Sequence, residues 1–311
     1  MKERLIIGSI LASLLGIESI RVAQSAPPSS QTKPAKPDSQ QAANLLIYVA
    51  ELQRHLPDDV YRYPYATDVT GQNVFRAGLV RLSNYETLFP GSMRDAVALA
   101  RAQAYEKLTA YAEAGKGYQI AQQSSDSNLS KVAGEGFERV RKFDKAANPV
   151  MDKSGMRTFE RDLQTKIRDL DDLASQYKGT PYSTHALLER ERAQLQLAEF
   201  YLTNRFILPY STNDAIAQIK RNIEQNRNSK NLYTHHLMLA DLYYDLAREY
   251  TILNDPDGPD FKLKEFQGFA NSARTEYGIV QQADGFSEKL EGRAKLAALE
   301  AFVERISDRA R

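Results

Sequence analysis

The sequence of 311 residues contains no cysteine and no tryptophan. Without cysteine the protein has no disulfide bond, no thiol chemistry and no cysteine-ligated metal, so its stability must come from packing alone. A dominant charge sign is also missing, because 41 Lys and Arg stand against 40 Asp and Glu. No global field therefore favours nucleic acid or an anionic membrane surface as a partner. The negative mean hydropathy argues against a polytopic membrane protein.

The usual motifs of catalytic and metal sites are missing as well. The chain has no His-Glu-x2-His, no glycine-rich phosphate loop and no Gly-x-Ser-x-Gly. Its adjacent residues His235 and His236 would diverge by about 100° on a helix, so they cannot both bind one metal. The stretch 255–260 carries three aspartates and two prolines, and the prolines favour a rigid solvated loop. We therefore predict no catalytic residue, no metal and no cofactor, and a protein that is not an enzyme.

Residues 1–25 have the parts of a secretory signal. A basic start precedes the apolar run 5–17, whose 13 residues are short for a membrane span. Ala23 and Ser25 supply small side chains at the two recognition positions before a cleavage point, so we expect a cleaved signal and a periplasmic or secreted protein. Its removal leaves the chain formally neutral. The alternative is an uncleaved membrane anchor, because Glu18 and Arg21 make an unusual cleavage region.

Two regions of different composition follow the signal. Residues 26–41 are rich in Pro, Ser, Gln and Lys and lack aromatic and branched aliphatic side chains, so we predict a disordered linker. Residues 42–311 carry helical periodicity in about eleven segments and no convincing strand pattern, which predicts one helical domain. Ser92 and Ser211 are each followed three residues later by an aspartate, as in a capping box at the start of a helix.

The most informative pattern lies between residues 102 and 121. Ala102 and Tyr105 are three residues apart, and Ala114, Tyr118 and Ala121 follow at spacings of four and three. Such spacings place each set on one face of a helix. Small residues let two helix backbones approach, and the large rings fill the space beside them. The pattern therefore predicts a tight antiparallel helix pair.

This pattern resembles the core of the tetratricopeptide repeat. It departs from the repeat at Ala98, Arg101 and Asp126, where the repeat has Trp, Leu and Pro. Two further cores resemble it, each followed by a helix with a small-x3-large pair. They are 197–201 with Ala215 and Ile219, and 239–243 with Ala273 and Tyr277. The resemblance implies an all-α fold of antiparallel helix pairs stacked as an α-α solenoid. An ordinary helical bundle with incidental matches is the alternative.

Two turns resemble junctions of bacterial periplasmic repeat proteins, such as the outer-membrane assembly lipoproteins. They are 88–92 and 176–183, and each runs from an apolar helix end into a turn that opens a new helix. Those lipoproteins carry a lipid-bearing cysteine, which this chain lacks, so their anchor is absent here. A third stretch, 60–65, is dense in tyrosine and contains Pro64, which bars regular helix. We expect it to cap the first helix pair; a recognition loop is the alternative.

The resemblance also implies a function, namely a scaffold that binds a protein or peptide partner along a concave surface formed by the first helix of each pair. The residues expected to face this surface are Gln103, Glu106, Lys107, Arg192, Glu199, Asp241, Tyr244 and Asp245. These side chains could instead be simple solvated helix faces. Two other functions stay open: a cell-wall-directed enzyme on a helical superhelix, and a membrane-tethered structural protein.

Overall fold

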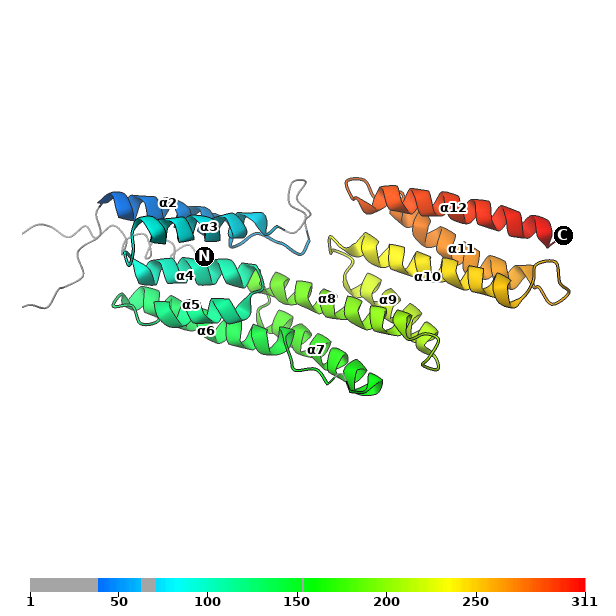
Figure 1. Ribbon diagram of the computed structural model, residues 1–311, viewed down its shortest axis with the longest axis horizontal. Coiled ribbons are helices and arrows are strands. Elements are labelled where there is room, and N and C mark those ends of the chain that lie inside the picture. The colour runs from blue at the N-terminus through cyan, green and yellow to red at the C-terminus, as the bar shows by residue number, and fades with distance from the viewer. Residues whose placement is uncertain (1–38, 63–70, 153, 311) are drawn as a thin grey trace, which may run out of the picture. The chain divides into compact units, whose positions relative to one another are not determined.

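The computed structural model describes residues 39–62, 71–152 and 154–310, where every regular element is a helix (Figure 1). These residues form 11 helices, which confirms the all-α prediction. In chain order the helices are α2 (Ser39–His55), α3 (Asn73–Leu88), α4 (Arg94–Lys107), α5 (Tyr111–Ala121), α6 (Ser127–Ala147), α7 (Met156–Gln176), α8 (Pro181–Thr203), α9 (Ser211–Gln225), α10 (Leu232–Leu253), α11 (Leu263–Val280) and α12 (Glu288–Arg309). The predicted signal 1–25 lies outside the described residues.

The predicted linker 26–41 also lies outside the described residues, except for its last three positions. Those three are helical, because α2 begins at Ser39. Glutamine and alanine follow and favour helix, and Leu45 and Val49 then bury the apolar face of α2. Gln41 is further tied to the fold, since its Oε1 accepts a hydrogen bond of 2.9 Å from Ser92 Oγ. The helix α2 therefore begins three residues before the predicted end of the linker.

Most helices pack against their neighbours in the sequence (Figure 1). The backbone contacts divide the chain into two compact units, and α7 and α8 contribute residues to both. In the first unit, α2 to α6 pack in succession, and α4 also contacts α2 and α6. In the second unit, α9 to α12 pack in succession, and α10 also contacts α12. Such contacts are those of stacked helix pairs. Nothing in the sequence marks a boundary between the units within 42–311.

The contact between α4 and α5 has the predicted small residues. Ala102, Ala114 and Ala121 are fully buried. The closest approach is at Gly117, where an added Cβ would lie 2.9 Å from Cβ of Ala102. The predicted large residue, Tyr118, is buried against α6. The pattern therefore identified buried residues of this helix pair, but it missed Gly117 at the closest approach, and Tyr118 packs on α6.

The other two predicted pairs also pack as expected. In the second unit Ala198 of α8 shares a core cluster with Ala215 and Ile219 of α9. Ala240 of α10 shares another cluster with Ala273 and Tyr277 of α11, and all six of these residues have 0% exposure. Each helix with a small-x3-large pair therefore packs against the preceding helix that carries the matching repeat-like pattern.

Enlarging these buried alanines should destabilise the protein. We expect Ala114→Leu and Ala198→Phe each to lower the free energy of unfolding by about 1–3 kcal/mol, because both side chains are fully buried and a larger one would overpack the core. Ala112→Leu, on the exposed face of α5, serves as the control and should change stability by less than about 0.5 kcal/mol. Thermal unfolding measures the difference. Unchanged melting temperatures for both buried variants would contradict the packing described here.

Replacing glycine with alanine should have opposite effects on stability at Gly136 and at Gly268. An added Cβ at Gly136 of α6 would lie 2.6 Å from Cζ of the buried Tyr118 ring, whereas at Gly268 of α11 no atom lies within 4 Å. Alanine favours helix over glycine by about 1 kcal/mol, so Gly268→Ala should stabilise the protein by about that amount. At Gly136 the overpacking cost of about 1–3 kcal/mol should exceed the gain. Equal shifts in melting temperature would contradict this account.

The two predicted capping boxes are not formed. The helix α4 begins at Arg94 after Met93, whose φ is 49°, and no side chain caps it. Ser211 is itself the first residue of α9, and its Oγ donates to the carbonyl of Tyr201 at 2.8 Å. Both helices start within two residues of the predicted positions. The two serine hydroxyls instead donate hydrogen bonds to residues of other helices, Ser92 to Gln41 and Ser211 to Tyr201. The sequence alone does not show that these partners lie nearby.

Candidate functional site

The structure distributes the eight predicted contact residues over four environments. Gln103, Glu106 and Lys107 line a cavity in the first unit. Asp241 and Asp245 line a groove in the second unit. Arg192 and Glu199 are exposed on α8 outside both hollows. Tyr244 packs its ring edge-on against Phe302, with centroids 5.6 Å apart, as part of the core between α10 and α12.

The groove of the second unit, here called the acidic groove, has a volume of about 580 Å³. Leucine and methionine side chains supply its apolar surface, and four carboxylates and one guanidinium supply its charge. Its lining residues are Leu202, Arg205, Thr234, Leu237, Met238, Asp241, Leu242, Asp245, Ser287, Glu288 and Glu291. Three helices therefore shape it: the end of α8, the first half of α10 and the start of α12.

Several charges of the acidic groove are paired within the fold. Asp241 accepts hydrogen bonds from the Tyr277 hydroxyl at 2.5 Å and from Lys295 Nζ at 2.7 Å. Burial, followed by this bond to Asp241, raises the pKa of Tyr277 well above its usual range. Lys295 also pairs with Glu291 at 2.7 Å, and Arg205 binds the carboxylate of Glu249 outside the groove. Asp241 is thus held by a core tyrosine as well as by a cation.

The negative charge of Asp245 is less well paired with cations than that of Asp241. Its ion pair with Arg248 is long, at 3.9 Å, and its side chain is 50% exposed. Partial burial raises the pKa of the Asp245 carboxyl, Arg205 opposes that shift, and the neighbouring Glu249 adds to it. Negative charge is therefore concentrated on this side of α10, where Asp241 and Asp245 lie one helical turn apart.

The hollow of the first unit, here called the Glu106 cavity, has a volume of about 180 Å³. Glu106, Lys107 and His185 in its lining are buried, with exposures of 5%, 3% and 2%. The full lining is Gln53, Leu56, Pro57, Gln103, Glu106, Lys107, Tyr118, Val132, Glu135, Arg139, Pro181, Tyr182 and His185. Residues from α2, α4, α5 and α6 and the first turn of α8 thus enclose a space that contains buried charges.

Glu106 forms a buried ion pair with Arg139. Its two carboxylate oxygens accept from Arg139 Nε at 2.5 Å and from Arg139 Nη2 at 2.8 Å, and the Tyr118 hydroxyl donates at 2.6 Å. Burial lowers the pKa of Arg139, but Glu106 more than offsets this, and the net shift is upward. Burial and the same carboxylate raise the pKa of Tyr118. The Arg139 guanidinium also stacks 3.7 Å from the Tyr182 ring centroid.

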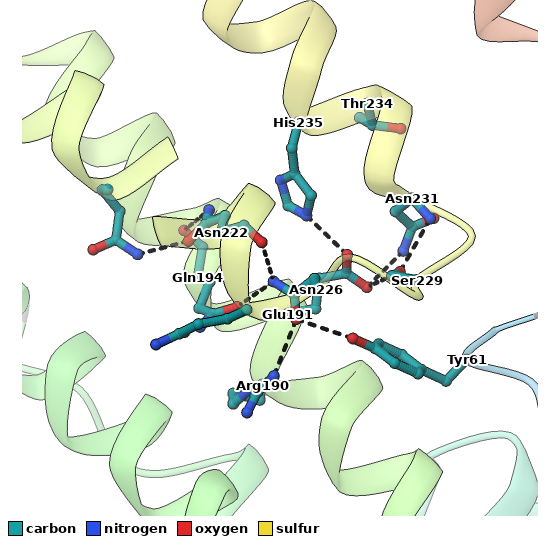
Figure 2. A network of polar contacts seen from close by, with 12 residues as sticks. Tyr61, Arg190, Glu191, Gln194, Asn222, Asn226, Ser229, Asn231, Thr234 and His235 are labelled. Carbon is teal, nitrogen blue, oxygen red and sulfur yellow. Dashed lines mark hydrogen bonds and ion pairs between the residues drawn. The ribbon is translucent and has the colours of Figure 1, made fainter. Parts of the chain in front are cut away.

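A second buried polar group lies in the second unit, around Glu191 of α8 (Figure 2). Glu191 and His235 are both fully buried, and the His235 ring nitrogen Nε2 is 2.8 Å from Glu191 Oε1. The other carboxylate oxygen accepts from Ser229 Oγ at 2.7 Å and from Asn231 Nδ2 at 3.0 Å. The carboxylate therefore joins α8, the connection between α9 and α10, and α10 itself.

Asn226 extends this network (Figure 2). Its Oδ1 accepts from the Tyr61 hydroxyl and from Arg190 Nη2, both at 3.1 Å, and its Nδ2 donates to Gln194 Oε1 at 2.8 Å. The Tyr61 carbonyl accepts from the Lys230 amide at 3.1 Å, and burial raises the pKa of Tyr61 to about 12. The first tyrosine of the stretch 60–65 thus belongs to the second unit and does not cap the first helix pair. Residues 63–65 lie outside the described part.

The two adjacent histidines serve different contacts, as expected for neighbouring helix positions. His235 faces Glu191, whereas His236 Nδ1 lies 2.6 Å from Glu276 of α11. The residues around Glu191 were missed at the sequence level. The available signal was the polar spacing of four between Asn222 and Asn226, on the same face of α9 as buried Ala215. Because the network is enclosed, it stabilises the fold and offers no surface to a ligand.

Within the described residues, no three carboxylates or histidines are grouped as metal ligands. The described helices also include none with the length and apolar character needed to cross a membrane. Comparison of the chain with models of protein families, with curated proteins and with solved structures gives no match. The structure therefore defines an all-helical protein whose 11 described helices pack mostly against sequence neighbours, and it identifies no family.

Proposed function

We propose that the protein is an exported helical-repeat scaffold, stacked as an α-α solenoid, that binds a protein or peptide partner. The acidic groove is the proposed binding surface. The single observation that supports this choice is the combination of apolar and acidic side chains in its lining, with Asp241 and Asp245 among them. The proposal does not depend on Arg192, Glu199 or Tyr244, which lie outside the groove.

The chemistry of the acidic groove points to one kind of occupant. Leu202, Leu237 and Met238 offer apolar contact, while the carboxylates outnumber the guanidinium in the lining. A peptide segment that alternates apolar and basic side chains would complement both features. Its apolar residues would lose water against the leucines, and its Lys or Arg residues would pair with the carboxylates. The proposed partner is therefore a basic amphipathic segment of another protein.

Two labelled peptides of equal length test this, one alternating Leu with Lys and the other Leu with Glu. We expect only the Lys peptide to bind, and its affinity should fall as salt rises because exposed charges are screened. Asp245→Asn with Glu291→Gln should weaken it by about tenfold, since a charge-assisted contact contributes about 1.5–3 kcal/mol when partly buried. Fluorescence polarisation measures both effects.

The matched control removes two charges from the same unit outside the groove. Glu199 and Glu224 are both exposed, so Glu199→Gln with Glu224→Gln changes the net charge equally. This control should leave the affinity for the Lys peptide nearly unchanged. Equal losses in the two double variants would mean that overall charge, and not the groove, attracts the peptide. Equal binding of both peptides would contradict the proposal that the acidic groove selects a basic segment.

One observation favours the alternative of a cell-wall-directed enzyme. Such an enzyme needs a carboxylic acid of raised pKa in a hollow, and Asp245 lies in the acidic groove with its pKa raised by burial. Incubation with peptidoglycan, followed by detection of released fragments, tests this function directly. Release by the unaltered protein and its loss in Asp245→Asn would establish it in place of the scaffold. N-terminal sequencing of the exported protein separately tests whether residues 1–25 are removed.

A further inference from the structure

We infer that a groove of the second unit, lined by four glutamines, is a binding site for a sugar acid, that is, a ring with several hydroxyl groups and one carboxylate. The four are Gln164 of α7, Gln194 of α8, and Gln218 and Gln225 of α9, and we call the site the glutamine groove. It has a volume of about 320 Å³ and shares no lining residue with the acidic groove. The inference goes beyond the proposed function and does not rest on it.

The glutamine side chains are held by hydrogen bonds that begin at the enclosed network around Asn226 (Figure 2). Asn226 Nδ2 donates to Gln194 Oε1 at 2.8 Å, and Gln194 Nε2 donates to Gln225 Oε1 at 2.5 Å. Gln218 Nε2 donates to Asn222 Oδ1 at 2.7 Å. Gln194 and Gln218 are also buried, with exposures of 1% and 6%. The fold therefore fixes these amides in place before any ligand binds.

These bonds leave the glutamine groove with both donors and acceptors that have no partner among the described residues. Gln225 Nε2 donates to none of them, and the Oε1 atoms of Gln164 and Gln218 accept from none. Gln164 uses only its Nε2, which donates to Glu160 and Tyr201. A hydroxyl group can donate one hydrogen bond and accept two. A ring with several hydroxyls can therefore satisfy both kinds of group.

Arg221 supplies the charge of the glutamine groove. It shares a face of α9 with Gln218 and Gln225, at spacings of three and four residues, and it is exposed. It makes no hydrogen bond or ion pair with any residue that the structure describes. Its guanidinium is thus available to bind a planar carboxylate through two parallel N–H donors. Among the described lining residues Arg221 alone is charged, so a carboxylate would not be repelled there.

Two apolar side chains, Ile167 and Leu197, complete the lining. They can cover the C–H groups of a sugar ring, which are apolar between its hydroxyls. An aliphatic acid would leave the unpartnered amide groups without hydrogen bonds, and a neutral sugar would leave Arg221 without an anion. A sugar acid satisfies the amides, the guanidinium and the apolar pair together. The same chemistry is found in a free sugar acid and in a uronate unit of a polysaccharide.

Four probes on the full protein test the class of ligand and its source. Galacturonate carries the hydroxyls and the carboxylate, galactose keeps only the hydroxyls, and cyclohexanecarboxylate keeps only the carboxylate on a ring. Saturation-transfer NMR and calorimetry should show galacturonate binding about tenfold more tightly than either of the others, because each of them lacks one set of contacts. Tighter binding of trigalacturonate than of galacturonate would identify a polysaccharide as the source, and equal binding would identify a free sugar acid.

Two variants with different expected patterns locate the binding in the glutamine groove. Arg221→Met removes the guanidinium, so it should weaken galacturonate by about fivefold to tenfold and leave galactose unchanged. Gln164→Met removes an acceptor for hydroxyls, so it should weaken both sugars by about threefold to fivefold and leave cyclohexanecarboxylate unchanged. Lys220→Met is the control for net charge, because Lys220 is exposed on α9 and its Nζ lies 5.8 Å from the centroid of the Tyr243 ring on α10. Circular dichroism checks that each variant is folded.

Each of four outcomes would overturn the inference. Equal affinities of galacturonate and either single-feature probe would show that the glutamine groove does not select a sugar acid, and this comparison needs no variant. Tighter binding of the capped peptide acetyl-Gly-Asp-Gly-amide than of galacturonate would assign the groove to an acidic peptide. Equal effects of Arg221→Met and Lys220→Met would place the bound carboxylate elsewhere. No binding of any probe at millimolar concentration would make the lining a solvated surface. None of these results bears on the acidic groove, whose test uses other residues.

Discussion

Replacing Glu191 with alanine is expected to lower the free energy of unfolding by about 3–5 kcal/mol, the usual cost of breaking a buried charged pair. The carboxylate has no exposure and accepts from His235, Ser229 and Asn231. Its loss would leave three donors in a closed space without an acceptor, and each unsatisfied donor costs about 1–3 kcal/mol. Relaxation and entering water should recover part of that sum. Chemical unfolding measures the loss.

The matched control for Glu191→Ala lies on the same helix. Glu199→Ala removes an identical side chain from the exposed face of α8, so its effect should stay within about 0.5 kcal/mol. Hydrogen exchange should further show that Glu191→Ala lowers the protection of the backbone amides in α8, α9 and α10 before that of other helices, because the network joins these helices. A loss similar to that of Glu199→Ala would mean that the donors around Glu191 find other partners.

The helical fold and the burial of its small residues could be predicted from the sequence because they depend on local spacing. The burial of Ala102, Ala114 and Tyr118 follows from which positions share a helix face. Asp241 and Asp245, which the resemblance to the repeat assigned to a contact surface, line the same groove because they are four residues apart on α10. Residues three or four positions apart share a helix face regardless of how the helices pack.

The polar interior could not be predicted in the same way. Glu106 looks like a surface residue in its own helix, yet its partner Arg139 is 33 residues away, and His235 is 44 residues from Glu191. Such pairs depend on how helices are placed around one another, which one sequence without its relatives does not reveal. Tyr244 shows the same limit, because α10 contacts α9, α11 and α12 and therefore has little free face.

Removing one side of the Glu106–Arg139 pair should cost more than removing both. The two side chains are only 7% and 14% exposed. In Glu106→Leu the Arg139 guanidinium stays in a largely dry space without its carboxylate, and the Tyr118 hydroxyl loses its acceptor as well. We expect this variant to lose about 3–5 kcal/mol of unfolding free energy. Arg139→Met should cost a similar amount, because it leaves the buried carboxylate without its cation.

The double variant Glu106→Leu with Arg139→Met should recover most of this loss, because apolar side chains of similar size often replace a buried ion pair at little cost. The remaining deficit should come from the Tyr118 hydroxyl, at about 1–3 kcal/mol. Adding Tyr118→Phe should then remove that deficit. A double-mutant cycle by chemical unfolding measures the coupling. If the two single losses simply add, the pair does not act as a unit, and the buried charges of the Glu106 cavity are stabilised by other groups.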